Sequence, residues 1–402
     1  MRSTPDQASA SAASLNMYVL EINDWEIRLL NNDDELILSE PAVGLYLDNK
    51  LIFGHQALQA SRLHPQFFAN QYINRLSSEP LNKPLGESKN QADLLYRHLK
   101  ALNIKEELVV LIPSNFTNEK LGIFLGIAKQ AGISVKGFVD APLAYTLEVP
   151  SSKDLHILDL DLHQTSITQI HIEGNKRSVV DNRSIESMGF TSIIDGWLNV
   201  IADEFIQKTR FDPFHFAQTE QQLFDCVIQH LQNHAADELK VEITHNQQDR
   251  LVSLSTKMLT DKLESKVNNL ELDTVQSLVI THRVLQIPGL YQILESTVPV
   301  ITKIQKGQLY KNIAQLTSGM NNESVSRITS GISAAEIVTQ DKRDDGAKLA
   351  YRTRATHLLH DNHACRLDDP AVSSHTSSLA KTLLVGEQVQ IDSKTYIAIS
   401  VE

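Results

Sequence analysis

The sequence has few of the features that mark secreted, membrane-spanning or nucleic-acid-binding proteins. Its 402 residues include only two cysteines, so we expect no disulfide framework. The net charge of −12 disfavours the basic surface that non-specific nucleic-acid binding requires. No apolar run reaches the length of a membrane-spanning helix, and no signal-peptide core is present. We therefore expect a cytoplasmic protein with neither a nucleic-acid partner nor a membrane span.

Chain length and composition are those of a globular protein with more than one domain. The chain is 42% hydrophobic and 21% charged, which is ordinary for a globular protein, and its length suits two or three domains. Residues 1–16 are polar and rich in Ser and Ala, which predicts a disordered tail. Short β-prone runs among many Ser, Asp, His and Thr residues begin near residue 321. They predict a small β-rich appendage over residues 321–402.

The middle of the chain has the clearest secondary-structure pattern. Residues 108–112 are wholly apolar and rich in β-branched side chains, which predicts a strand that is buried on both faces. Apolar residues at helical spacing follow and end at Gly132, a typical helix stop. A β-prone run at 135–139 completes a strand–helix–strand unit of a parallel sheet. Residues 155–160 and 168–172 then predict a β-hairpin whose turn carries an acid and hydroxyls.

This region resembles a known family. The segment IPSNFTNEKLGIFLGIAKQAGISVKGFVDAPLAYTLE resembles the first-lobe core of the seventy-kilodalton heat-shock chaperones, which share a superfamily with actin and the sugar kinases. The resemblance extends over about residues 17–320. It implies an α/β fold of two actin-like (ribonuclease H-like) lobes, at residues 17–153 and 154–320. Within the second lobe, residues 211–268 correspond to the outer subdomain.

The family's first phosphate-binding loop has changed in this chain. A loop that grips phosphate needs small residues, because its backbone N–H groups must approach the phosphate oxygens. The family has Asp-x-Gly-Thr-Thr, and the matching residues here are Glu21, Ile22, Asn23, Asp24 and Trp25. The glycine is lost, and an acid and an indole replace the hydroxyls. A carboxylate at Asp24 would repel a triphosphate at close range.

The second phosphate-binding loop is also altered. It keeps the acid as Asp161, and Thr165 or Ser166 supplies a hydroxyl, but His163 and Gln164 replace its glycines. His163 is either a base or a solvated turn residue.

Four further positions of the family's cleft differ here. Asn74 stands where the family has a phosphate-facing lysine, and Ala141 replaces an acid that positions metal and water. Gly189 is the retained half of a Gly-Gly pair, whereas Thr281 and His282 replace both glycines of the adenosine-binding turn. Changes at every loop, with the intervening strands intact, indicate that the scaffold is kept and the hydrolytic site is not.

The resemblance and these departures together predict a degenerate chaperone-like protein. It would bind protein partners as a scaffold or regulator without hydrolysing ATP. The alternative is an ATP-dependent chaperone-like ATPase with a divergent site. ATP or ADP with magnesium would then be its cofactor, and Asp161 would be required for turnover.

One other group of residues could carry chemistry. His357, His360, His363 and Cys365 lie close together in HLLHDNHAC, and all four are possible zinc ligands. The Asp-Asn pair between them is equally a good hairpin turn, which would make His360 and His363 an ordinary cross-strand pair. The sequence favours the plain hairpin.

Overall fold

The computed structural model describes residues 18–151, 153–232, 238–304, 309–318, 325–333, 357–360, 363–366, 388–391 and 394–399. The chain divides into two compact units, Met1–Thr339 (unit 1) and Gln340–Glu402 (unit 2). Both contain β-sheet, and unit 1 also contains helices, so the expected α/β class is confirmed.

The first sheet of unit 1 combines an antiparallel meander with parallel strands. The meander is β1 (Tyr18–Ile22), β2 (Glu26–Leu30) and β3 (Leu36–Pro41). β9 (Glu107–Ile112) lies parallel to β1, and β10 (Ser134–Asp140) lies parallel to β9. The five apolar residues of β9 are all fully buried, which confirms the expected strand with two buried faces.

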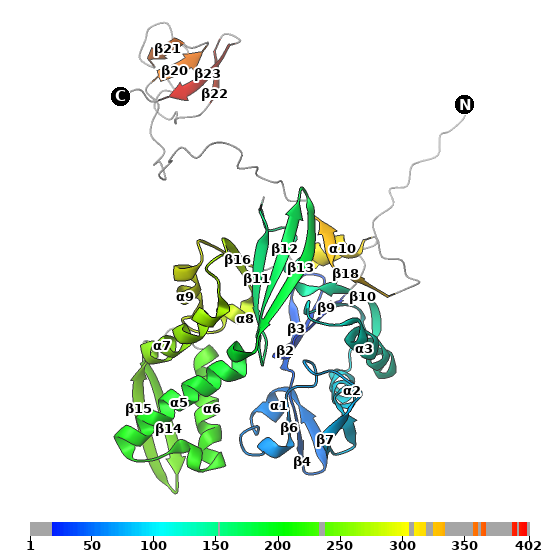
Figure 1. Ribbon diagram of the computed structural model, residues 1–402, viewed down its shortest axis with the longest axis vertical. Helices are drawn as coiled ribbons and strands as arrows, with labels where there is room; N and C mark the ends of the chain where they lie inside the picture. The colour runs from blue at the N-terminus through cyan, green and yellow to red at the C-terminus, as the bar shows by residue number, and fades with distance from the viewer. Residues whose placement is uncertain are drawn as a thin grey trace, which may run out of the picture. The chain divides into compact units, whose positions relative to one another are not determined.

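The second sheet repeats this arrangement. Its meander is β11 (Leu155–Leu160), β12 (Thr165–Glu173) and β13 (Lys176–Ile185), and the first pair confirms the expected hairpin. β16 (Ser277–Ile280) lies parallel to β11, and β17 (Val300–Lys303) lies parallel to β16. The two sheets lie side by side in Figure 1. Unit 1 therefore uses the same strand order twice.

The predicted crossover between β9 and β10 is present. It contains α3 (Asn118–Ala131), which begins where the Thr117 side chain accepts a hydrogen bond from the Lys120 amide. The helix ends at Gly132, whose φ of +79° is in the left-handed region that favours glycine. α2 (Gln91–Leu102) packs against α3, and Figure 1 shows both at the same flank of the first sheet.

Residues 77–93 are polar and contain two prolines, a composition that predicts a loop or an insertion. In the structure they include a hairpin of β7 (Pro80–Leu85) and β8 (Ser88–Asn90). Gly86 makes the turn at a φ of +61°. Since the strands are short and largely exposed, they lack the apolar alternation that marks a strand in sequence.

The remaining elements of unit 1 surround the two sheets. In the first half they are β4 (Gly44–Leu47), β5 (Lys50–Phe53), α1 (Gly54–Leu58), η1 (Pro65–Phe67), β6 (Phe68–Ala69) and α4 (Ala141–Thr146). In the second half they are η2 (Glu186–Met188), α5 (Phe190–Thr209), η3 (Pro213–His215), α6 (Ala217–Gln232), β14 (Glu238–His245), β15 (Gln248–Ser255), α7 (Thr256–Val267), η4 (Asn268–Leu270), α8 (His282–Leu285), α9 (Leu290–Thr297) and α10 (Leu309–Thr317).

A short segment near the end of unit 1 joins the edges of both sheets. β18 (Ser326–Ile328) pairs with β10, and β19 (Ser330–Ile332) pairs with β13. Arg327 adds two hydrogen bonds to the Asp140 carboxylate, at 2.7 and 3.0 Å. The expected appendage began at residue 321, whereas this segment belongs to the sheets of unit 1.

Unit 2 contains one antiparallel sheet. Its strands are β20 (His357–His360), β21 (His363–Arg366), β22 (Gln388–Ile391) and β23 (Lys394–Ile399), in the order β21-β20-β23-β22. The predicted hairpin is present, with His360 opposite His363. The side chains of the four possible zinc ligands lie outside the described part of the structure.

Candidate functional site

The turns that close the first hairpin of each sheet meet in unit 1. Asn23, between β1 and β2, donates a 2.5 Å hydrogen bond from Nδ2 to Oδ1 of Asp161, which follows β11. A second hydrogen bond joins the same turns, because Asp24 Oδ1 accepts from the Leu162 backbone N–H at 2.5 Å. The residues predicted from the two altered phosphate loops are thus in direct contact. We call the region between the two sheets, where these turns meet, the cleft.

Asp24 and Asp161 form a buried carboxyl pair. Asp161 also accepts hydrogen bonds from Gln164 at 3.2 Å and Ser166 at 2.8 Å. Burial, followed by the nearby charge of Asp24, raises the pKa of Asp161 well above its usual value. Burial also raises the pKa of Asp24 to about 7. Both carboxyl groups therefore hold a proton more readily than an exposed aspartate does, and Oδ2 of Asp24 has no hydrogen-bond partner.

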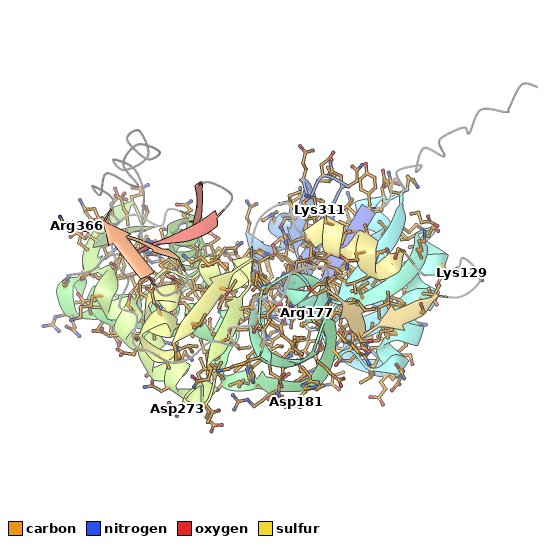
Figure 2. All side chains as sticks on the ribbon, turned by 90° about the horizontal axis from the view of Figure 1, so that it is seen from above. Lys129, Arg177, Asp181, Asp273, Lys311 and Arg366 are labelled. Atoms are coloured by element: carbon orange, nitrogen blue, oxygen red, sulfur yellow. The ribbon has the colours of Figure 1, made fainter. Side chains whose placement is uncertain are left out.

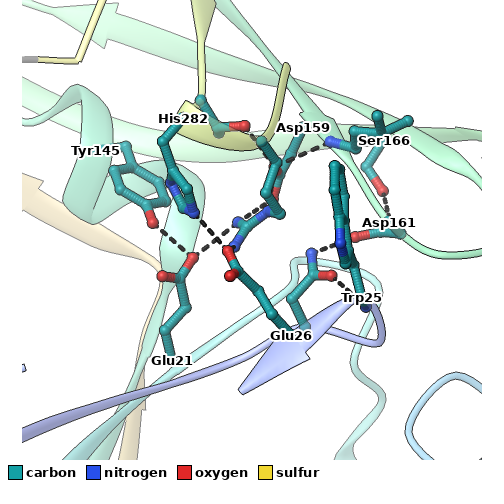
Figure 3. Close-up of polar contacts among 12 residues, drawn as sticks. Glu21, Trp25, Glu26, Tyr145, Asp159, Asp161, Ser166 and His282 are labelled. Carbon is teal, nitrogen blue, oxygen red and sulfur yellow. Dashed lines mark hydrogen bonds and ion pairs between the residues drawn. The ribbon is translucent and has the colours of Figure 1, made fainter. Parts of the chain in front are cut away.

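Arg283 crosses the cleft and joins the two sheets. It lies on α8, is 1% exposed, and donates from Nη2 to Glu21 Oε1 and to Asp159 Oδ2, both at 2.7 Å. Its Nε donates to Asp159 Oδ1 at 2.9 Å, and its Nη1 donates to Glu26 Oε1 at 3.3 Å. Figure 3 shows these acids converging from β1, β2 and β11. One guanidinium thus neutralises acids from both sheets.

Further polar residues complete what we call the ionic cluster, which comprises Glu21, Glu26, Arg28, Tyr145, Asp159, His282 and Arg283. Glu21 accepts hydrogen bonds from Arg28 Nη1 at 2.9 Å and from the Tyr145 hydroxyl at 2.5 Å. His282 Nε2 lies 2.6 Å from Glu26 Oε1. These contacts satisfy the buried carboxylates with protein groups (Figure 3).

Glu21 and Glu26 are charged despite their burial. Burial opposes ionisation of Glu21, but Arg283 and Arg28 outweigh it and hold the pKa of Glu21 far below its usual value. Against the same burial, the His282 hydrogen bond and the Arg283 charge lower the pKa of Glu26 to about 2. The cluster holds three carboxyl groups, from Glu21, Glu26 and Asp159, and two guanidinium groups, from Arg28 and Arg283.

The turn after β11 is bonded to the start of α5. The Thr165 hydroxyl donates to the Met188 carbonyl oxygen. The amides of Phe190 and Thr191 donate to the carbonyl oxygens of Asp161 and Leu162, both at 2.9 Å. The first amides of α5 are therefore already paired within the protein and are not directed at a ligand.

Gly189 is required by close packing at this junction. A Cβ atom at this position would lie 2.2 Å from the carbonyl carbon of His163 and 2.5 Å from the amide nitrogen of Gln164. Both contacts are with backbone, which cannot move aside without shifting the turn. The retained glycine is explained by helix–turn packing.

Side chains at the other predicted positions contact different groups. His163 is partly buried, and its Nε2 donates to the Asn70 carbonyl oxygen at 2.9 Å, so this nitrogen does not act as a base. Burial lowers the pKa of His163, which favours the neutral ring. Ala141 is buried in the first turn of α4. Thr281 donates from its hydroxyl to Asp159 at 2.6 Å.

Lys120 contacts the chain at Asn74. It lies on α3 and donates from Nζ to the Asn74 carbonyl oxygen at 2.6 Å. Burial lowers the pKa of Lys120, and the charge of Asp24 partly offsets this effect. A positive group is therefore present at the position where the sequence resemblance implies a lysine.

Sequence reasoning missed most of the ionic cluster. Arg283, Asp159, Glu26, Arg28 and Tyr145 were not among the predicted site residues. Two signals were present: Asp159 lies between the apolar residues Leu158 and Leu160, and Glu21 lies directly opposite Arg28 across the β1–β2 hairpin. Both signals indicate buried charge.

Within the described part of the chain, no group of three or more His, Cys, Asp or Glu residues is arranged to hold a metal ion. No described helix is both long and apolar enough to cross a membrane. The sequence matches no protein-family model and no curated protein.

Proposed function

We propose that unit 1 is a degenerate two-lobed, actin-like scaffold, related to the heat-shock chaperones, which binds other proteins and does not hydrolyse ATP. The repeated strand order of its two sheets supports the two-lobed description. The sequence resemblance supports the same fold. On this proposal the two turns that meet in the cleft correspond to the two phosphate loops of the family.

The observation that carries the proposal is the position of Arg283. Its guanidinium lies between the turns, at 1% exposure, and is bonded to Glu21, Glu26 and Asp159. A triphosphate in that place would have to displace these ion pairs and approach the carboxylates of Glu21 and Glu26. The ionic cluster is therefore better suited to holding the two sheets together than to binding phosphate.

Calorimetric titration of the full chain with ATP and with ADP, each with magnesium, tests the proposal that the protein does not hydrolyse ATP. We expect no binding heat for either nucleotide from a protein whose far-UV circular dichroism shows it to be folded. The Arg62→Ala variant serves as a control, because Arg62 forms partly exposed ion pairs with Asp195 and Glu220 outside the ionic cluster. Micromolar binding to the unaltered chain would overturn the proposal.

One contact favours the alternative of a divergent ATPase. Lys120 lies beside Asn74 and is electrostatically coupled to Asp24, so it could provide the positive charge that the family's lysine supplies. If this alternative holds, the chain will hydrolyse ATP, and both Lys120→Met and Asp161→Ala will abolish turnover. We expect no turnover from the unaltered chain.

The exposed edge of the first sheet supports the proposal that unit 1 binds other proteins. β3 is the outermost strand on that side among the described strands, and its Leu36 and Ile37 are 51% and 54% exposed. Exposed edge strands with apolar side chains pair readily with segments of other proteins. We expect the full chain to capture partners that the Ile37→Lys variant does not. Equal capture by both would exclude this edge as the binding surface.

A further inference from the structure

The cleft between the sheets contains a second, apolar region beside the ionic cluster. It is a cavity of about 460 Å³, within the range of roughly 300–1,000 Å³ that is usual for small-molecule sites. Its apolar walls come from both halves of unit 1. They are formed by Trp25, Val43, Leu58, Phe190, Ile228 and Leu231.

An aromatic pair forms part of this cavity. The rings of Trp25 and Phe190 lie with their centroids 4.1 Å apart and their planes inclined by 31°. Each residue comes from a different half, since Trp25 follows β1 and Phe190 begins α5. Aromatic walls favour a flat ring ligand, and the indole face also attracts cations.

The polar groups at the cavity set the charge that it accepts. Glu26 lines it and links it to the ionic cluster, where Oε2 accepts from Ser39 at 2.9 Å and Oε1 is bonded to His282 and Arg283. His55 and Gln286 add an imidazole and an amide. Glu26 is the one carboxylate among the residues that line the cavity, so an anion bound there would lie against a negative charge.

We propose that this cavity binds a small aromatic ligand that is neutral or cationic. The inference goes beyond the scaffold function, because it assigns a ligand class to the part of the cleft that the ionic cluster leaves free. Different experiments test the two proposals. Binding of Mg-ATP would overturn the scaffold function, whereas the dye-binding experiment below tests the ligand proposed for the cavity.

Two dyes with the same ring skeleton provide the test on the full chain. N-phenyl-1-naphthylamine is neutral, and 1-anilinonaphthalene-8-sulfonate adds one negative charge to the same frame. We expect saturable binding of the neutral dye, followed by its own fluorescence, and an affinity about tenfold or more weaker for the sulfonated dye. Absence of saturable binding by the neutral dye would overturn the proposal.

Substitutions in the cavity wall test whether the neutral dye binds in this cavity. Ile228→Trp and Leu58→Trp each add bulk to a partly buried position on opposite walls, so one remains informative if the other does not fold. Each should weaken binding of the neutral dye by about tenfold or more. The matched control is Ile206→Trp, at a 39% exposed position of α5 that does not line the cavity. Equal binding by the folded wall variants and the control would show that the dye sits elsewhere.

Discussion

Replacement of Arg283 by methionine tests how much the ionic cluster contributes to stability. The change removes a 1% exposed guanidinium and leaves the carboxylates of Glu21, Glu26 and Asp159 without it. Breaking a buried ion pair from one side costs about 3–5 kcal/mol, because the remaining charge stays buried. Glu21 keeps Arg28 as an ionic partner, so we expect about 3 kcal/mol, at the lower end.

Urea unfolding is the appropriate assay. Tryptophan fluorescence reports on Trp25 in the cleft and Trp197 in the buried core of the second half, and far-UV circular dichroism reports on the whole chain. A loss of about 3 kcal/mol corresponds to a midpoint lower by roughly 1 M urea. Arg62→Ala is the control. It removes a cross-half ion pair whose acid, Asp195, is 44% exposed, so its loss should cost at most about 1 kcal/mol.

A double substitution distinguishes the stability that is lost with the ion pairs from the stability that is lost with side-chain packing. Adding Asp159→Asn to Arg283→Met removes an acid that has lost its partner, and this should recover part of the stability. Asp159→Asn alone should instead be destabilising, because it weakens an intact pair. The reasoning is refuted if Arg283→Met lowers the midpoint no more than Arg62→Ala, or if the two substitutions are simply additive.

Two further predictions concern the turns. Since the pKa of Asp24 is raised to about 7 in the folded chain, the folded state binds an extra proton between about pH 4 and 7, and stability should fall as the pH rises through this window. The Asp24→Asn variant should flatten that fall in urea midpoints measured from pH 4 to 8, and an unchanged slope would assign it to other groups. Gly189→Ala should cost about 3 kcal/mol by overpacking against backbone, whereas Gly126→Ala, in exposed α3 with nothing near its Cβ, should stabilise by about 0.5–1 kcal/mol. Thermal unfolding of both variants checks this pair, and a Gly189→Ala variant as stable as the parent contradicts the packing argument.

Local sequence patterns determined several elements of the chain. The apolar run of β9 predicted a strand buried on both faces, and the helical spacing that stops at Gly132 located the end of α3. The β11–β12 hairpin and the hairpin at residues 357–366 followed from turn residues between β-prone runs. These features depend on neighbours a few residues apart, which a sequence displays directly. The β7–β8 hairpin was missed because its exposed strands carry no such pattern.

The sequence also identified which loops would form the cleft, since the altered turns at Asn23 and Asp161 are in contact. It did not show what occupies the cleft. Arg283 bonds to Glu21 although 262 residues separate them, and Trp25 packs against Phe190, which begins α5 in the other half of unit 1. The ionic cluster and the aromatic cavity exist only because the two repeated sheets place these residues together. A buried charge is stable only where distant partners surround it, and that arrangement was decided by the tertiary structure alone.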